Sequence, residues 1–298
     1  MKAVGYFVDM ANEVRDWWRY DVWDVFALLA EVNARDMPIE THNTLFSSDD
    51  LLRLQGSIRD LRRFDRYLRR RLVELNGVRA WEYGHLVNAI GSFEGLSVLE
   101  IGPGPSTLPF YMASKGARVT MLELPATRTP QLEEKCARKG IALEFGDMRK
   151  LPFHSEAFDL VTCISVLEHL HHGHPDPERT DLLEYEEFVS QTIVALKEMS
   201  RVLKIGGRLY VTTEACLPDL VGFDEWLGRK PSPVVAAYDI AEIERSLIPA
   251  LRDAGVRMIG PTQYSHRLLL SDPRRGNYRN RYITTFILYG AKEASASK

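Results

Sequence analysis

The sequence predicts an α/β fold in which a largely parallel sheet is covered by helices and preceded by a helical extension. From residue 97 onward, short apolar runs alternate with helical segments, as in βαβ units. The first 90 residues instead carry apolar residues at three- to four-residue spacing, which is typical of amphipathic helices. A glycine turn at residues 102–104 directly follows the first apolar run, where a βα unit binds its ligand.

Length and composition favour one large soluble domain with an extension. The chain has 298 residues, of which 45% are hydrophobic and 27% charged. Its net charge of −3 gives no general attraction for nucleic acid or anionic lipid. Cys136, Cys163 and Cys216 form no CxxC pair, so we expect neither a disulfide framework nor a zinc knuckle. With no signal-peptide core or membrane span in the sequence, a cytoplasmic protein is expected.

Residues 1–90 are predicted to form a helical hairpin. An apolar stripe runs from Val14 to Val32, and Pro38 ends that helix. The second helix begins near Ser47 and continues to Leu75. Aromatic residues of the first helix either line a ligand pocket or belong to plain core or an interface, namely Trp17, Trp18, Tyr20 and Trp23. The extension is a lid or a dimerisation element, and the sequence does not separate the two.

Residues 91–293 are predicted to form the α/β domain, followed by a disordered tail at 294–298. Seven strands are expected, at Ser97–Ile101, Arg118–Glu123, Leu143–Phe145, Phe158–Ile164, Gly207–Thr213, Val256–Gly260 and Tyr282–Gly290. Four helices are expected between them. The first starts near Ser106 with Pro109 in its first turn, and the second is capped by Thr129. The third covers Tyr185–Val202, and the fourth covers Asp239–Ala254, with Asp239 and Glu242 as a capping box.

The residues around the glycine turn favour a nucleoside without a pyrophosphate as the ligand. Gly102 and Gly104 allow a sharp bend and a close backbone approach to a ligand. A dinucleotide fingerprint needs a third glycine where Thr107 stands. Glu123, about 20 residues after the first glycine, is placed to accept hydrogen bonds from ribose hydroxyls. Glu100 can help to balance a positively charged ligand. Alone, a Gly-x-Gly turn is also compatible with a mere tight turn.

The successive motifs of the second half strengthen this interpretation. They are Val98-Leu99-Glu100-Ile101-Gly102-Pro103-Gly104, Gly146-Asp147-Met148, Leu151-Pro152-Phe153, Phe158-Asp159-Leu160, Ser165-Val166-Leu167-Glu168-His169-Leu170 and Arg201-Val202-Leu203-Lys204-Ile205-Gly206-Gly207. In this order the chain resembles the class I S-adenosylmethionine-dependent methyltransferases, over about residues 95–215. The resemblance implies a Rossmann-like, seven-stranded, mostly parallel sheet with a reversed last strand.

The resemblance also implies S-adenosyl-L-methionine as the cofactor and a set of residues that bind it. These are Glu100, Gly102, Pro103, Gly104, Glu123, Leu124, Asp147, Met148 and Ser165. Glu100, Ser165 and the glycine turn would surround the methionine part, Glu123 would hold the ribose, and Asp147 with Met148 would contact the adenine. Asp147 is also compatible with a simple turn residue, and Asp159 is expected to serve the fold.

Catalysis of methyl transfer to a hydroxyl requires a base, and histidine is the first choice. His169 and His171, directly after the fourth strand, are the candidates, with His266 as a second choice. Four histidines between residues 169 and 174 raise the question of a metal site, but no companion carboxylate pattern supports one. Local packing of His169 and solvation of the others is the plainer alternative.

The acceptor is expected to be a small molecule methylated through oxygen, with nitrogen and carbon left open. The stretch after the fourth strand lacks the Asp/Asn-Pro-Pro-aromatic pattern of amino-methylating nucleic-acid enzymes. An RNA methyltransferase remains a rival, because residues 53–79 carry nine arginines against three acids. A third hypothesis is an inactive, donor-binding interaction protein. The partners expected are therefore a small-molecule acceptor and, if the N-terminal helices serve dimerisation, a second copy, with nucleic acid disfavoured.

Overall fold

The computed structural model describes residues 43–45, 48–67, 78–104, 106–172, 185–216, 238–239, 242–259, 262–264 and 283–294. Several predictions lie outside these residues. They are the first helix of the extension with its aromatic group, the end of the second helix beyond Tyr67, His266, and the last four residues of the tail.

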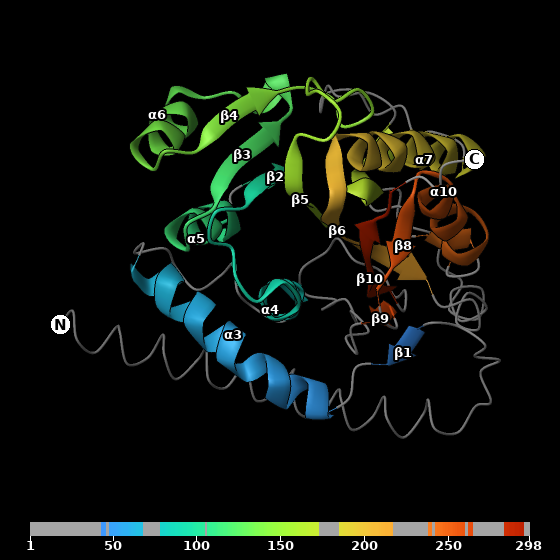
Figure 1. Ribbon diagram of the computed structural model, residues 1–298, viewed down its shortest axis with the longest axis horizontal. Coiled ribbons are helices and arrows are strands. Elements are labelled where there is room, and N and C mark those ends of the chain that lie inside the picture. The colour runs from blue at the N-terminus through green and yellow to red at the C-terminus, as the bar shows by residue number, and fades with distance from the viewer. Residues whose placement is uncertain are drawn as a thin grey trace, which may run out of the picture.

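The strands of the described residues join one mixed sheet (Figure 1). Its order is β1-β9-β10-β6-β5-β2-β3-β4, with β7 paired to β6 and β8 paired to β10. The bounds are β1 Asn43–Leu45, β2 Ser97–Ile101, β3 Arg118–Glu123, β4 Ala142–Phe145, β5 Phe158–Ile164, β6 Leu203–Cys216, β7 Tyr238–Asp239, β8 Val256–Met258, β9 Thr262–Tyr264 and β10 Ile283–Lys292.

The predicted topology is confirmed. The five strands β4, β3, β2, β5 and β6 run parallel, and β10 is antiparallel to both β6 and β8. The seven predicted strands are all present, and three of them, β2, β3 and β5, have the predicted bounds. The short strands β1, β7 and β9 extend the sheet beyond the prediction.

Helices cover both faces of the sheet (Figure 1). Their bounds are α3 Ser48–Tyr67, α4 Val78–Ile90, α5 Leu108–Ser114, η2 Pro125–Thr127, α6 Pro130–Arg138, η3 Leu167–His172, α7 Tyr185–Val202, the π-helix η5 Ile243–Leu247 and α10 Ile248–Asp253. Two hydrophobic clusters divide them, because α3, α4, α5 and α6 pack on one face of the sheet, and α7, η5 and α10 pack on the other.

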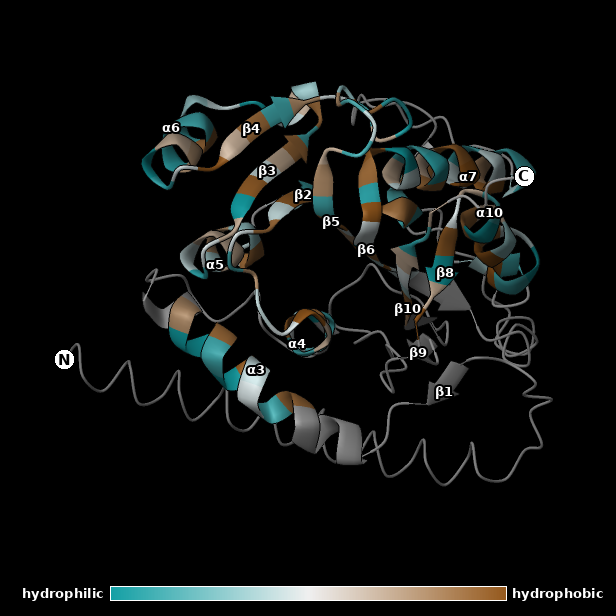
Figure 2. Cartoon of the chain, in the orientation of Figure 1, coloured by the Kyte–Doolittle hydropathy of each residue, from teal (hydrophilic) through white to brown (hydrophobic). Residues whose placement is uncertain are grey.

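Alternation along the strands explains this three-layer arrangement. In β5, Leu160 and Ile164 join the cluster beneath α4 and α5, whereas Val161 and Cys163 join the cluster beneath α7. Both faces of this strand are therefore buried and apolar. In Figure 2 the hydrophobic colours run along much of β3 and β6, whereas α6 shows both hydrophilic and hydrophobic residues. The core thus lies on both sides of the central strands.

The helical extension is partly as predicted. Helix α3 begins at Ser48 and buries Leu54 and Leu61, which confirms the apolar face expected there. Helix α4 was not predicted as a separate helix. It packs against α3 and buries Tyr83 and Leu86 in the same cluster that lies beneath α5. The described part of the extension therefore shares a hydrophobic core with the sheet.

The helix predictions of the second half hold, with one correction. Thr129 caps α6 by accepting a hydrogen bond from the amide of Leu132, and Pro109 lies in the first turn of α5. The capping box of Asp239 and Glu242 was wrong. Asp239 lies in β7, and the side chain of Glu242 instead accepts a hydrogen bond from Ser246. The helical segment begins at Ile243 with Glu242 in the N-cap position, so Asp239 lies three residues before the position from which it would cap this helix.

Asp159 serves the fold, as expected. Its carboxylate accepts hydrogen bonds from the amide and the hydroxyl of Ser97 at 2.9 and 2.5 Å, and both its oxygens lie 2.9 Å from Lys204 Nζ. These contacts join the beginnings of β2 and β5 to β6. Burial opposes ionisation, but the bonds from Ser97 and the charge of Lys204 lower the pKa of Asp159 to about 2.

Candidate functional site

The glycine turn lies between β2 and α5 in a conformation that favours glycine. Gly102 and Gly104 have φ angles of 61° and 55°, in the left-handed region. The amide of Gly102 donates to the carbonyl of Leu122 over 2.8 Å, which fixes the turn to β3. A Cβ on Gly102 would lie 2.8 Å from Cγ1 of Val166, whereas a Cβ on Gly104 would meet no atom within 4 Å. The turn is closely packed at its first glycine and open at its second.

Glu123 ends β3 and faces this turn. Its Oε1 accepts a hydrogen bond from the Gly104 amide over 2.7 Å, and its Oε2 accepts one from Thr127 Oγ1 over 3.3 Å. Burial raises the pKa of Glu123, and these two hydrogen bonds oppose that rise. A carboxylate offers about four acceptor positions, so Glu123 retains capacity for ligand hydroxyls.

The turn after β4 brings Asp147 and Met148 to the same edge. The amide of Gly146 donates to the carbonyl of Glu123 over 2.9 Å, so the two strand ends are adjacent. Asp147 accepts from the backbone amide of Arg149 over 2.8 Å and forms an ion pair with its guanidinium. Burial opposes ionisation, but the bonds from Arg149 prevail and lower the pKa of Asp147. Met148 is partly buried against the core.

Glu100 is buried near the end of β2, and only 2% of its surface is exposed. Burial raises the pKa of Glu100 to about 8, and the hydrogen bond with Thr162 opposes that rise. Thr162 Oγ1 contacts both this carboxyl and the Leu99 carbonyl. One hydroxyl has one proton to donate, and a protonated Glu100 satisfies both contacts. The expectation that Glu100 balances a positive ligand therefore requires this carboxyl to ionise when the ligand binds.

Ser165 follows β5 and has a left-handed backbone with a φ of 48°. Its amide donates to the carbonyl and to Oγ1 of Thr212, both at 3.0 Å, and its hydroxyl donates to Glu82 Oε1 over 2.7 Å. Such a conformation is uncommon for a residue other than glycine. The serine is therefore held in place by specific partners on β6 and α4.

Sequence reasoning missed the contribution of α4 to this edge. Glu82 is fully buried, and its Oε2 accepts a hydrogen bond from Arg79 Nη1 over 2.8 Å. Tyr83 Oη lies 2.9 Å from Ser106 Oγ, at the end of the glycine turn. The available signal was a single acidic residue within the mostly apolar stretch Trp81–Ile90, since a buried charge requires a partner.

The predicted catalytic histidines lie in η3, directly after Ser165 and Val166. His169 is exposed, and its amide donates to the Val166 carbonyl over 3.0 Å. His171 belongs to the same short helix. Glu168, which precedes His169 in η3, is buried and accepts a hydrogen bond from Thr213 Oγ1 on β6 over 3.0 Å. The structure thus brings both histidine positions to the edge at which Ser165 lies.

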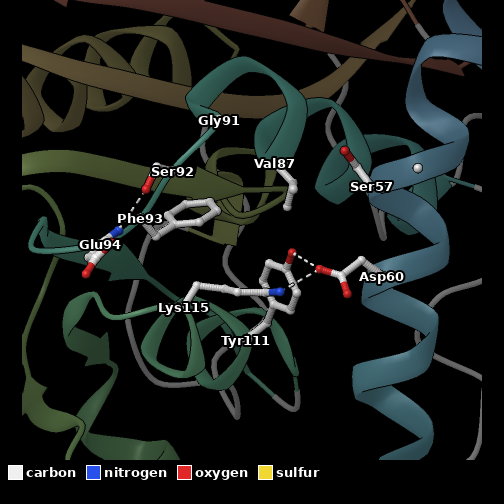
Figure 3. A pocket seen from close by; sticks show the side chains of 10 residues that line it. Ser57, Asp60, Val87, Gly91, Ser92, Phe93, Glu94, Tyr111 and Lys115 are labelled. Carbon is white, nitrogen blue, oxygen red and sulfur yellow. Dashed lines mark hydrogen bonds and ion pairs between the residues drawn. The ribbon is translucent and has the colours of Figure 1, made fainter.

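A separate pocket of about 330 Å³ lies at the opposite edge of the sheet (Figure 3). It is lined by residues of α3, α5 and the segment before β2, among them Asp60, Phe93 and Lys115. Lys115 Nζ and Tyr111 Oη approach Asp60 at 2.7 and 2.8 Å. None of the predicted site residues lines this pocket. It lies near the beginning of β2, whereas ligands of such sheets bind at the strand ends.

Comparison with known families identifies the α/β part of the chain. The family described as "Methyltransferase domain" matches residues 99–211, which span β2 to β6 and contain the glycine turn. Residues 99–211 thus form a methyltransferase domain, in agreement with the class I S-adenosylmethionine-dependent methyltransferases that the motifs resemble. The sheet order and the antiparallel β10 agree with the topology that this resemblance implied.

Three relatives of the methyltransferase domain have names that refer to quinones or hydroquinones. A demethylmenaquinone methyltransferase of Thermobifida fusca is 32% identical over 52% of this chain and 58% of its own length. A ubiquinone biosynthesis O-methyltransferase of Marinobacter nauticus is 23% identical over 59% of this chain and 63% of its own. A 2-methyl-6-phytyl-1,4-hydroquinone methyltransferase of Oryza sativa is 27% identical over 57% of this chain and 42% of its own. The chain thus spans between 42% and 63% of these relatives.

Among solved structures, the magnesium protoporphyrin IX methyltransferase of Synechocystis with bound SAH is 14% identical to this chain, with a TM-score of 0.47. The alignment covers 83% of this chain and all of that one. In the parts of the chain that the structure describes, no helix combines the length and the apolar character that crossing a membrane needs. Within the same parts, no group of three or more His, Cys, Asp or Glu side chains is arranged to hold a metal ion.

Proposed function

We propose that this protein transfers the methyl group of S-adenosylmethionine to an oxygen atom of a small aromatic acceptor of the hydroquinone class. The observation that carries the proposal is the hydrogen bond from the Gly104 amide to Glu123. It joins an open glycine bend to a carboxylate with spare acceptor capacity, within the matched methyltransferase domain. The relatives in quinone chemistry support the class of acceptor.

The residues at this edge fit the proposed donor. Open space beside Gly104 leaves room for a ligand against the backbone. In our proposal Glu123 and Leu124 hold the ribose, Asp147 and Met148 hold the adenine, and Gly102–Gly104 with Glu100 and Ser165 surround the methionine part. The carboxylate of Asp147 already binds Arg149, so its contact with adenine would have to share that carboxylate. When bound, S-adenosylmethionine supplies an electrophilic methyl carbon on a positively charged sulfur.

The chain's own contribution to transfer is mainly to hold two reactants in line and to remove a proton. We propose His169 and His171 as candidates for that base, because η3 carries both to the end of β5. Replacing the true base by alanine should lower kcat by roughly 100-fold while leaving donor affinity unchanged. The exposed His154 provides a matched control. Equal kcat values in all three alanine variants would exclude both candidates.

The function is tested by supplying methyl-labelled S-adenosylmethionine and three acceptors in parallel. These are a catechol-type ubiquinol precursor, a demethylmenaquinol and bulk RNA. We expect one labelled methyl on the quinol-type acceptors, and NMR of the product tells oxygen from carbon methylation. Glu123→Ala serves as the inactive control. Label in RNA alone would support the nucleic-acid alternative, and donor binding without transfer to any acceptor would support an inactive binding protein.

We further propose a cytoplasmic protein that pairs with a second copy through its N-terminal helices. The amphipathic pattern of residues 14–32 supports such pairing, because its apolar stripe needs a partner surface. Light scattering after size-exclusion chromatography should give twice the mass of the 298-residue chain. A variant that lacks residues 1–40 should then give a monomer, and a monomeric full chain would contradict the proposal.

A further inference from the structure

We propose that Glu82 is a positioning residue of the methyl-donor site, acting from α4 through the turn that follows β5. The inference rests on the proposed function and deepens it, because it assigns part of the N-terminal extension to the donor site. It starts from a feature that the function described above does not use. This feature is a fully buried carboxylate at the ligand edge, on a helix outside the matched domain.

Glu82 binds three side chains at once. Its Oε1 accepts hydrogen bonds from Ser165 Oγ over 2.7 Å and from Thr212 Oγ1 over 2.5 Å. Its Oε2 accepts the guanidinium of Arg79 over 2.8 Å. The backbone carbonyl of Glu82 also accepts from Tyr210 Oη over 2.8 Å. One residue of α4 thereby binds both the turn after β5 and the strand β6.

These contacts hold Ser165 in its uncommon backbone conformation. Thr212 Oγ1 accepts from the Ser165 amide over 3.0 Å, and the Thr212 hydroxyl in turn donates to Glu82. The serine is therefore bound at its amide and at its hydroxyl. The bond from its hydroxyl ends on Glu82, and one of the two bonds from its amide ends on a hydroxyl that Glu82 orients, while the other ends on the Thr212 carbonyl. A left-handed residue other than glycine persists when its surroundings determine it, and Glu82 supplies the side-chain part of those surroundings.

The turn so fixed packs directly on the glycine bend. Val166 follows Ser165, and its Cγ1 lies 2.8 Å from the position that a Cβ of Gly102 would take. Because nothing but a hydrogen fits between them, a shift of Val166 changes the space at Gly102. The path from the carboxylate to the proposed donor site is thus short and continuous, running from Glu82 through Ser165 and Val166 to Gly102.

Helix α4 also contacts the segment that follows the glycine bend on the same side of the site. Tyr83 Oη lies 2.9 Å from Ser106 Oγ, which accepts from the Leu108 amide in the first turn of α5. Adjacent residues of α4 therefore bind the turn after β5 and the helix after the glycine bend. A buried charge that served only core stability could often be replaced by a well-packed apolar residue, whereas the Glu82 carboxylate is bound by Ser165 at the ligand edge.

Glu82→Gln tests the role with almost no change in volume. The amide has one oxygen, so it can accept either from Arg79 or from the two hydroxyls, and its NH₂ group then faces donors on the other side. We expect S-adenosylmethionine to bind roughly tenfold more weakly by calorimetry. Hydrogen exchange at the Ser165 amide should become faster, because its bond to the Thr212 hydroxyl weakens and only its bond to the Thr212 carbonyl remains.

A double-mutant cycle with Ser165→Gly separates positioning from general destabilisation. Glycine adopts the left-handed backbone without help, so adding E82Q to S165G should weaken donor binding by less than about threefold. Asp159→Asn provides the stability control, since Asp159 lies where β2 and β5 begin, whereas the ligand edge is where these strands end. It should lower Tm without weakening donor binding. An equal effect of E82Q with and without S165G would overturn the proposal.

Failure of this proposal differs from failure of the proposed function. If the wild-type protein binds no S-adenosylmethionine, the function is wrong. If the wild type binds the donor, while E82Q matches it in affinity and in exchange at Ser165, the function stands and the positioning role is wrong. Unchanged exchange at Ser165 in E82Q overturns the positioning role in either case.

Discussion

The amide nitrogen of Gly104 lies 2.7 Å from Oε1 of Glu123, so the turn after β2 is hydrogen-bonded to the end of β3. The carboxylate thereby orients the glycine bend even before a ligand arrives. A donor with two ribose hydroxyls would meet a carboxylate that is already aligned and partly desolvated. Preorganisation of this kind lowers the cost of binding, because less motion is lost on contact.

Replacing Glu123 by alanine should weaken S-adenosylmethionine binding by about ten- to a hundredfold. Hydrogen bonds to a charged group contribute about 1.5 to 3 kcal/mol each, and this variant also frees the Gly104 amide. Calorimetric titration measures the change. Glu134→Ala, an exposed surface variant on α6, should bind the donor as the wild type does. Unchanged affinity in Glu123→Ala would refute the ribose assignment.

The stability of the protein should depend on pH through Glu100. Its pKa is raised from 4.5 to about 8, so the folded state holds a proton that the unfolded state releases. The stabilisation is complete below pH 4.5 and is lost as pH rises through about 8. Glu100→Gln keeps a neutral side chain, so its unfolding free energy should fall less over this range, by on the order of 2 kcal/mol. Urea unfolding at several pH values tests this, and parallel pH curves would contradict it.

The two glycines of the turn should differ in their tolerance of alanine. Both are left-handed, which costs about 1 kcal/mol for alanine at either position. Only Gly102→Ala also places a methyl group 2.8 Å from Val166. We expect Gly102→Ala to lose about 2 kcal/mol more unfolding free energy than Gly104→Ala. Urea unfolding compares them directly, and equal losses would show that Val166 yields to the new methyl group.

The ion pair of Asp159 with Lys204 should stabilise the folded protein at neutral pH, and this contribution should be lost in acid. The pKa of Asp159 is lowered from 3.8 to about 2, so the folded state favours the ionised form. This contribution is present above pH 3.8 and is lost as pH falls through about 2. Since the group is partly exposed, Asp159→Asn should cost about 1 to 2 kcal/mol at pH 7. The difference from wild type should narrow on acidification, and a constant difference would contradict the linkage.

The sequence carried most of the information about the sheet. Strands β2, β3 and β5 are short apolar runs bounded by turns or charged residues, and such boundaries are local. Thr129 and Pro130 likewise mark the start of α6 by their own chemistry. The end of β6 and the paired Asp239 were less predictable, because strand extension there depends on pairing with residues far along the chain.

The candidate site was predictable only where its residues lie in the motif. Gly102, Gly104 and Glu123 meet as expected, since consecutive parallel strands end at one edge. Glu82 was missed because its partners, Ser165 and Thr212, are 83 and 130 residues away. Its helix also buries several sides, so it lacks the one-sided stripe by which α3 was recognised.

The docking of α4 has a consequence for chimeric enzymes. An exchange of N-terminal regions between relatives, made to transplant acceptor preference, would place a foreign side chain opposite Ser165 and Thr212. A junction cut just before β2 would therefore separate a carboxylate from the hydroxyls it binds, whereas a junction upstream of Arg79 would keep Arg79, Glu82 and Tyr83 with their partners. On our proposal, the donor-binding unit therefore begins about 20 residues before the matched domain, which starts at residue 99.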